Sequence, residues 1–77
     1  MPGTCLVAGA AGGLGQAIAA RFLDDGWTVL GWDVTPIDDD RVVGSMVDIS
    51  DWAAVAAAGQ SLPPLAAVIN SCGVASR

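Results

Sequence analysis

The chain has 77 residues, 53% of them hydrophobic and 14% charged, and carries a formal net charge of −5. All eight acidic residues are Asp, all three basic residues are Arg, and the sequence contains no Lys, His or Tyr. This composition argues against nucleic acid or anionic membranes as partners, which need clustered Lys and Arg, and it excludes a P-loop lysine, an ordinary zinc site and most side chains that transfer protons near neutral pH.

The first predicted elements are a strand, a glycine-rich loop and a helix. Residues 4–8 form a short apolar run that is typical of a buried strand, and a cluster of glycines follows at once. Leu14, Ile18 and Phe22 then recur at helical spacing, so we expect them on one apolar face of a helix. The helix is predicted to end at Gly26, because glycine readily adopts the left-handed conformation that closes a helix.

A second strand and a loop follow. Residues 27–33 are apolar on both faces up to the terminal Asp33, as expected of a strand that is covered on both sides. Residues 34–40 contain a proline and three successive Asp. This segment is too short and too polar for a crossover helix, so we interpret it as a loop.

The last part of the chain predicts two strands with a helix between them. Residues 41–47 and 66–71 are the apolar runs that we interpret as strands. Ser50 is the predicted N-cap of an alanine-rich helix that continues to about residue 58. We expect the three tryptophans, Trp27, Trp32 and Trp52, in core or edge packing.

The order of these elements predicts an α/β fold. Each helix must return the chain to the same edge of the sheet, which makes the strands parallel. Right-handed crossovers then give the strand order 3-2-1-4 with one helix on each face, a partial Rossmann fold. The sequence shows no repeat or linker, and we expect residues 1–77 to belong to a single domain.

The glycine loop, Gly9-Ala10-Ala11-Gly12-Gly13-Leu14-Gly15, lies between the first strand and the first helix. Glycines let the backbone turn sharply and approach an anion closely, and the free N–H groups at the start of a helix bind diphosphate with the help of the helix dipole. No basic side chain is needed, so an acidic protein can hold such a ligand. A tight turn between strand and helix is the alternative interpretation of the loop alone.

Asp33 strengthens the interpretation of the loop as a binding site. It follows Gly15 by eighteen residues and ends the second strand. There a carboxylate can accept hydrogen bonds from the adenosine ribose and would repel a 2′-phosphate. Neither the glycine loop nor the residues just after Asp33 include Arg or Lys, and Arg41 is expected at the opposite edge of the sheet. The sequence therefore predicts NAD, rather than NADP, as the cofactor.

Three segments resemble the short-chain dehydrogenases/reductases. Residues 7–15 are similar to the family motif Thr-Gly-x-x-x-Gly-x-Gly with Ala8 in place of Thr, residues 48–51 to Asp-Val-Thr/Ser-Asp, and residues 70–73 to Asn-Asn-Ala-Gly. The resemblance implies that the second segment contacts adenine and that the third lines the cofactor near the ribose and nicotinamide. The cofactor-binding residues predicted in all are Gly9, Gly12, Gly13, Leu14, Gly15, Asp33, Asp48, Ile49, Asn70, Cys72 and Gly73.

Within this family the chain most resembles the small type 2 3-hydroxyacyl-CoA dehydrogenase-like members, whose second crossover is similarly brief. The glycine spacing also fits Gly-x-x-Gly-x-x-Gly, with Gly9, Gly12 and Gly15, which is typical of the extended, epimerase-like branch. Residues 70–73 argue against that branch, in which we would expect a His-Leu-Ala-Ala type segment. We therefore predict the short branch and keep the extended branch as the alternative.

The resemblance implies hydride transfer between NAD and a carbonyl or alcohol substrate, using a Tyr, a Lys and a Ser that follow the fourth strand. The sequence has no Tyr or Lys, so we predict no catalytic residue here and expect the chain alone to be inactive. A missing C-terminal segment or a companion chain would supply catalysis, and the exposed edge of the fourth strand predicts a homo-oligomer. The alternatives are a stand-alone, non-catalytic dinucleotide-binding module and an association module.

Cys5 and Cys72 are interpreted as reduced, packed cysteines of a cytoplasmic protein, since no secretion signal is evident. A disulfide is the alternative, but the two residues are expected about 13 Å apart along neighbouring strands, whereas a disulfide needs Cα atoms within about 7 Å. We expect Cys72 to be a small apolar packing residue rather than a catalytic thiol. No metal site is predicted, because the run of three Asp lacks the ligand spacing of a calcium site.

Overall fold

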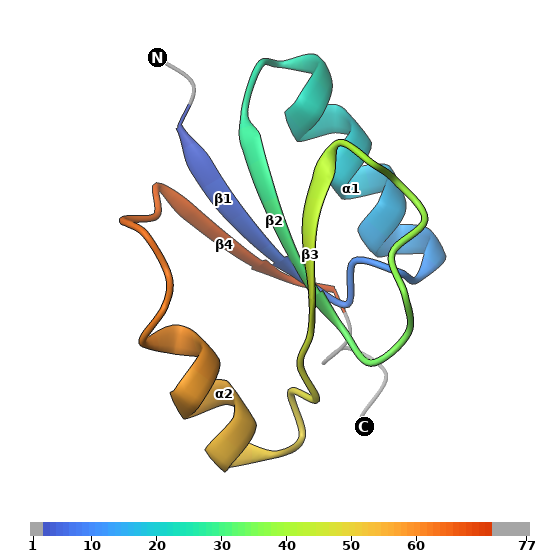
Figure 1. Ribbon diagram of the computed structural model, residues 1–77. Helices are drawn as coiled ribbons and strands as arrows, with labels where there is room; N and C mark the ends of the chain where they lie inside the picture. Colours follow the sequence, from blue (N-terminus) through green and yellow to red (C-terminus); the bar gives the residue numbers. More distant parts are fainter. Residues whose placement is uncertain (1–2, 72–77) are drawn as a thin grey trace.

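The computed structural model describes residues 3–71, and its elements follow one another in the predicted order (Figure 1). Each strand and helix lies within one or two residues of its predicted position. The elements are β1 (Thr4–Ala8), α1 (Gly13–Asp24), β2 (Thr28–Asp33), β3 (Val42–Met46), α2 (Trp52–Gly59) and β4 (Ala67–Asn70).

The four strands form one parallel sheet in the order β3-β2-β1-β4, which confirms the predicted topology. In this register Ala8, the last residue of β1, lies opposite Trp32 of β2 and Asn70 of β4. The carboxyl ends of the three strands therefore meet at one edge of the sheet. In folds of this class ligands bind at that edge.

The two helices lie on opposite faces of the sheet, as predicted (Figure 1), and an apolar cluster lies between each helix and the sheet. Because side chains alternate along a strand, Cys5 and Val7 of β1 pack toward α1, together with Ile18 and Phe22 of that helix. Leu6, between them, packs on the other face in the cluster that includes residues of α2. Burial raises the pKa of the Cys5 thiol.

Helix α1 ends as the sequence predicts. Gly26 has a positive φ of 88° and donates its N–H to the Leu23 carbonyl at 3.0 Å. The next residue, Trp27, donates its N–H to the Phe22 carbonyl at 2.9 Å, and the rings of Phe22 and Trp27 meet edge to face with centroids 4.9 Å apart. These contacts form a Schellman motif with its apolar contact, which turns the chain directly into β2.

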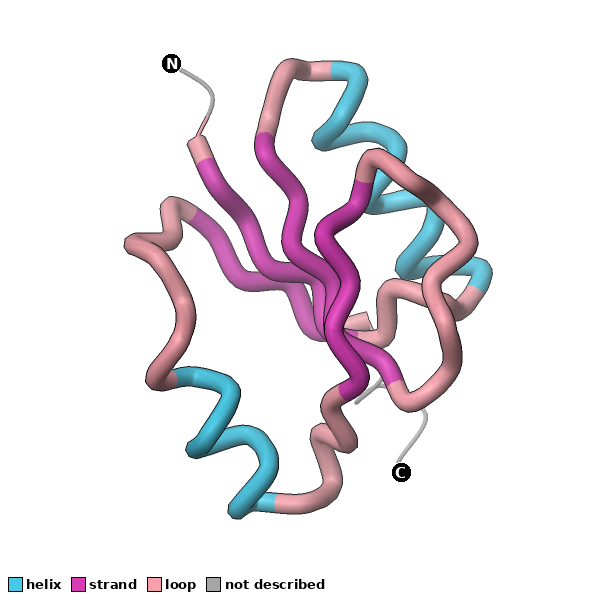
Figure 2. Tube along the Cα trace, viewed as in Figure 1, coloured by secondary structure: helices cyan, strands magenta, loops and turns pink. Residues whose placement is uncertain are grey.

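The connection between β2 and β3 is the predicted loop (Figure 2). Its Ile37 packs against the α1 face of the sheet over two glycines, Gly31 and Gly44. A Cβ atom on Gly31 would lie 2.7 Å from Ile37 Cδ1, and one on Gly44 would lie 3.2 Å from it. One isoleucine thus covers strands that a longer crossover would otherwise cover with a helix.

The predicted N-cap of α2 is wrong by one residue. Asp51, not Ser50, caps the helix, accepting hydrogen bonds from the N–H groups of Ala53 at 3.0 Å and Ala54 at 3.3 Å. Ser50 is engaged elsewhere: its N–H and its hydroxyl donate to Asp48 Oδ1 at 2.9 and 2.6 Å. These bonds hold the Ser50 side chain at Asp48, in the turn before the helix, and the N–H groups of Ala53 and Ala54 bond to Asp51 instead.

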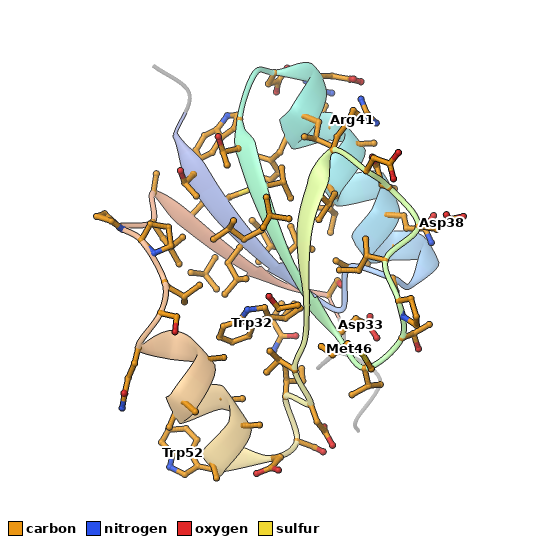
Figure 3. All side chains as sticks on the ribbon, viewed as in Figure 1. Trp32, Asp33, Asp38, Arg41, Met46 and Trp52 are labelled. Atoms are coloured by element: carbon orange, nitrogen blue, oxygen red, sulfur yellow. The ribbon has the colours of Figure 1, made fainter. Side chains whose placement is uncertain are left out.

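Trp52 also departs from its prediction. Trp32 is buried on the α2 face of the sheet, but Trp52 is 81% exposed at the start of α2 (Figure 3). No residue of α2 is buried, since the helix only partly covers that face. Neither helix in the described part of the chain is long and apolar enough to cross a membrane.

Candidate functional site

The glycine loop begins where β1 ends. Gly9 has a φ of 81°, a backbone angle that residues other than glycine rarely adopt. Its N–H donates to the Trp32 carbonyl at 2.8 Å, so the loop stays attached to β2 as it leaves the sheet. The Gly9 carbonyl in turn accepts the N–H of Gly12 at 3.2 Å, which closes a tight turn before α1.

Gly15 packs the first turn of α1 directly on this turn. It is buried, and a Cβ atom there would lie 2.8 Å from the carbonyl carbon of Gly9 and 2.9 Å from the Cα of Ala10. Both neighbours are backbone atoms, which cannot rotate away as a side chain can. Only glycine therefore lets the helix begin so close to the end of β1, which is the third role of glycine in dinucleotide-binding turns.

The start of α1 faces open space. Gly12 is the N-cap in an extended conformation, and it makes no side-chain capping bond. A Cβ atom on Gly13 would meet nothing within 4 Å. The first N–H groups of a helix lack intrahelical partners and carry a partial positive charge. This end of the helix can therefore accept an anion that approaches the backbone closely.

Leu14 does not join the apolar face predicted for α1. Ile18 and Phe22 pack on the core, but Leu14 is 60% exposed. It lies in the first turn, where the helix contacts the glycine loop instead of the sheet. Its exposure leaves it available to a ligand at this end of α1.

The structure brings Asp33 to the glycine loop. Its Oδ2 accepts the N–H of Ala11 at 3.0 Å, and its Oδ1 accepts the N–H of Thr35 at 3.0 Å. A carboxylate accepts about four hydrogen bonds, so both oxygens keep capacity for a hydroxyl. Figure 3 shows Asp33 at one end of the sheet and Arg41 at the other, and Arg41 pairs with Asp39 at 3.2 Å.

Asp33 shares a hollow with the second predicted segment. This cavity of about 120 Å³ is open to solvent and joins the ends of β1, β2 and β3. The Ser50 hydroxyl and N–H hold the pKa of the Asp48 carboxyl below its usual value, because both donate to the carboxylate. The residues that line the cavity are Gly9, Trp32, Asp33, Val34, Val47, Asp48 and Ile49.

Asn70 lies next to this hollow, across the end of β1. It is the β4 partner of Ala8, and together with Trp32 and Ile49 it lines a second cavity, of about 250 Å³, on the α2 face. The structure therefore brings Asn70 to the same edge of the sheet as Asp33, but into a separate hollow. The predictions for Cys72 and Gly73 lie outside the described residues.

Two residues that the sequence analysis missed also hold the glycine loop. The Ser71 hydroxyl donates to the carbonyls of Ala8 at 2.8 Å and Gly9 at 3.2 Å. The Gln16 side chain donates from Nε2 to the Ala11 carbonyl at 2.8 Å. Ser71 stands where the family motif Asn-Asn-Ala-Gly has its second Asn, which gave no indication of this contact, and an exposed glutamine in a helix carries no signal of its own.

The donors and acceptors at this edge suit a nucleotide rather than a metal. One loop N–H donates to Asp33, and Asp33 and Asp48 border the hollow of about 120 Å³ next to the loop. Among residues 3–71 no group of three or more His, Cys, Asp or Glu could hold a metal ion. Larger hollows of about 310 and 350 Å³ lie along β3, away from the glycine loop.

Comparisons with known proteins agree with this geometry. The model of the NAD dependent epimerase/dehydratase family matches residues 5–77. Among solved structures, a short-chain dehydrogenase/reductase from Burkholderia vietnamiensis is similar, with a TM-score of 0.69 and 29% sequence identity. That match covers 91% of this chain and 39% of the other chain. No curated protein matches the chain.

The two matches support the predicted resemblance to short-chain dehydrogenases/reductases. The solved structure is named a short-chain dehydrogenase/reductase. The family model is named for the epimerase-like proteins that we kept as the alternative. The narrower likeness to type 2 3-hydroxyacyl-CoA dehydrogenases stays a prediction. Because its family model spans nearly the whole sequence, the chain belongs to the NAD dependent epimerase/dehydratase family.

Proposed function

We propose that this chain binds NAD and forms the N-terminal, dinucleotide-binding part of a Rossmann domain in an oxidoreductase. The observation that carries the proposal is the hydrogen bond from the Ala11 N–H to Asp33 Oδ2 at 3.0 Å. It places the carboxylate that would accept the ribose hydroxyls beside the N–H groups that would hold the diphosphate.

The residues present fit the ADP half of NAD. Gly15 allows the close helix start, and the open space at Gly13 leaves room for a diphosphate at the N–H groups of α1. Asp33 would accept the ribose hydroxyls. Adenine would enter the hollow of about 120 Å³ that Asp48 and Ile49 line. Asn70 would lie toward the nicotinamide half.

The site favours NAD over NADP. The Asp33 carboxylate would lie close to a 2′-phosphate and repel it, and the segments on either side offer no basic partner to offset the repulsion. Arg41, the nearest Arg along the chain after Asp33, lies at the opposite end of the sheet, paired with Asp39 (Figure 3). The proposed selectivity therefore rests on one side chain.

The proposed reaction belongs to the whole protein, since the chain spans only 39% of the similar solved structure. Bound NAD would supply a nicotinamide ring that takes up or releases hydride, with a carbonyl or alcohol as the substrate. The sequence has no Tyr or Lys, the residues that the family uses as acid/base and its partner. We propose that a further C-terminal segment or a companion chain supplies them.

Gly13→Ala tests the proposed diphosphate position. A Cβ atom there meets no protein atom within 4 Å, so the free energy of unfolding should stay unchanged or rise by about 0.5–1 kcal/mol, as for glycine replaced by alanine in a helix. The same methyl group would occupy the diphosphate position, and we expect the dissociation constant for NAD, measured by calorimetry, to rise about tenfold.

Gly59→Ala is the matched control, because Gly59 also lies in a helix and a Cβ atom there also meets nothing within 4 Å. It should leave the affinity for NAD unchanged. If the Gly13→Ala protein binds NAD as tightly as the wild-type protein does, the diphosphate does not lie at this end of α1.

A further inference from the structure

The backbone of Ala11 is held on both sides of its Cα atom. Its N–H donates to Asp33 Oδ2 at 3.0 Å, and its carbonyl accepts from Gln16 Nε2 at 2.8 Å. Asp33 comes from the end of β2 and Gln16 from the second turn of α1. The glycine loop is therefore connected through the backbone of one residue to the strand before the ribose site and to the helix at the diphosphate site.

The hydrogen bond from Gln16 fixes the direction of the Ala11 carbonyl. A carbonyl oxygen that turned toward a bound diphosphate would repel it, and the hydrogen bond from Gln16 holds the Ala11 carbonyl to the helix instead. The carbonyl and the N–H of Ala11 belong to the two planar peptide units that meet at its Cα atom, so only the φ and ψ angles of Ala11 lie between them. Holding the carbonyl therefore limits the directions in which this N–H can point. That N–H is one of two backbone donors that orient the Asp33 carboxylate.

Gln16 also borders the loop that follows Asp33. Together with Ile37 and Asp38 it lines a cavity of about 160 Å³ between α1 and that loop. Its side chain is thus positioned where the glycine loop, the helix and the segment after β2 come together.

We propose that Gln16 is a positioning residue of the dinucleotide site, which sets the orientation of the Asp33 carboxylate through the backbone of Ala11. The proposal rests on the proposed function for its effect on cofactor selection. Gln16 itself does not discriminate between NAD and NADP. It keeps the discriminating carboxylate aimed at the ribose position.

The test is Gln16→Met, which keeps the length and helix propensity of the side chain but removes the donor. We expect the dissociation constant for NAD to rise about three- to tenfold, as for the loss of one neutral hydrogen bond. The affinity for NADP should fall less, so the preference for NAD should narrow. In the Asp33→Ala background, Gln16→Met should leave the ratio of the two affinities unchanged, because the carboxylate it positions is gone.

Two further measurements make the result decisive. Gln60→Met, the same change at an exposed position after α2, should leave both affinities unchanged. In ¹⁵N–¹H spectra of the ligand-free protein, the Ala11 amide should exchange faster with solvent in the Gln16→Met protein than in the wild-type protein. Equal exchange of the Ala11 amide, or an unchanged ratio of NAD to NADP affinity in a protein that binds NAD, would overturn the proposal.

The amide measurement needs no cofactor, so the two proposals can fail separately. If the wild-type protein bound neither dinucleotide, the proposed function would fail. The exchange of the Ala11 amide would still show whether Gln16 holds the backbone at Ala11. Faster exchange would then support the positioning role within the loop, and unchanged exchange would reject it.

Discussion

Gly15→Ala is expected to abolish measurable NAD binding and to lower the free energy of unfolding by about 3 kcal/mol, at the upper end for overpacking a buried site. The added Cβ atom would lie 2.8 Å from the carbonyl carbon of Gly9 and 2.9 Å from the Cα of Ala10. Both are backbone atoms at the end of β1, so relief requires α1 to move away from the sheet. Urea denaturation and calorimetry with NAD measure the two effects.

The contrast with neighbouring glycines gives this prediction its control. Gly12→Ala would place a Cβ atom 3.5 Å from the Gly9 carbonyl oxygen, an ordinary contact, and Gly13→Ala would place one in open space. Both proteins should fold with near wild-type stability. A Gly15→Ala protein that was as stable as these two would show that α1 does not start as close to β1 as described.

Asp33→Ala is expected to weaken NAD binding about 10- to 100-fold, since hydrogen bonds to a charged group contribute about 1.5–3 kcal/mol. The affinity for NADP should fall much less, because removing the carboxylate also removes its repulsion of the 2′-phosphate. The preference for NAD should therefore shrink or disappear. Calorimetric titrations of the variant with NAD and NADP measure both changes.

The ratio of the two affinities separates a binding role for Asp33 from a structural one. Asp33 also accepts hydrogen bonds from the N–H groups of Ala11 and Thr35. A purely structural role would therefore loosen the loop when Asp33 is removed, and the affinities for NAD and NADP would fall equally. Equal weakening would contradict the proposed contact with the ribose. Asp38→Ala removes the same charge from an exposed position on the following loop, and it should change neither affinity.

The fold could be predicted from the sequence at positions where a residue or a rule of chain connection allows a single local structure. Gly26 could end α1 because its left-handed conformation is accessible to glycine, and the structure gives it a φ of 88°. The strand order followed from parallel strands and right-handed crossovers. The proximity of Asp33 to the glycine loop followed in turn, since the ends of neighbouring parallel strands meet at one edge.

The details that failed depend on competition among neighbouring polar groups or on the extent of packing. Ser50 and Asp51 are both residue types that cap helices. In the structure Ser50 donates hydrogen bonds to Asp48, and Asp51 is the residue that caps α2. Trp52 is exposed because α2 covers the sheet only in part, which its apolar sequence does not reveal. The hydrogen bond of Gln16 to the glycine loop has no sequence signature at all.

Titration of the ¹⁵N-labelled protein with NAD, followed residue by residue in ¹⁵N–¹H spectra, tests the central claim most directly. The account predicts that the largest shifts fall on residues 9–15, on Asp33 and on residues 48–49, with little change at Arg41 or along α2. Shifts centred on β3 and the larger hollows beside it, or no saturable shift at the glycine loop, would contradict it.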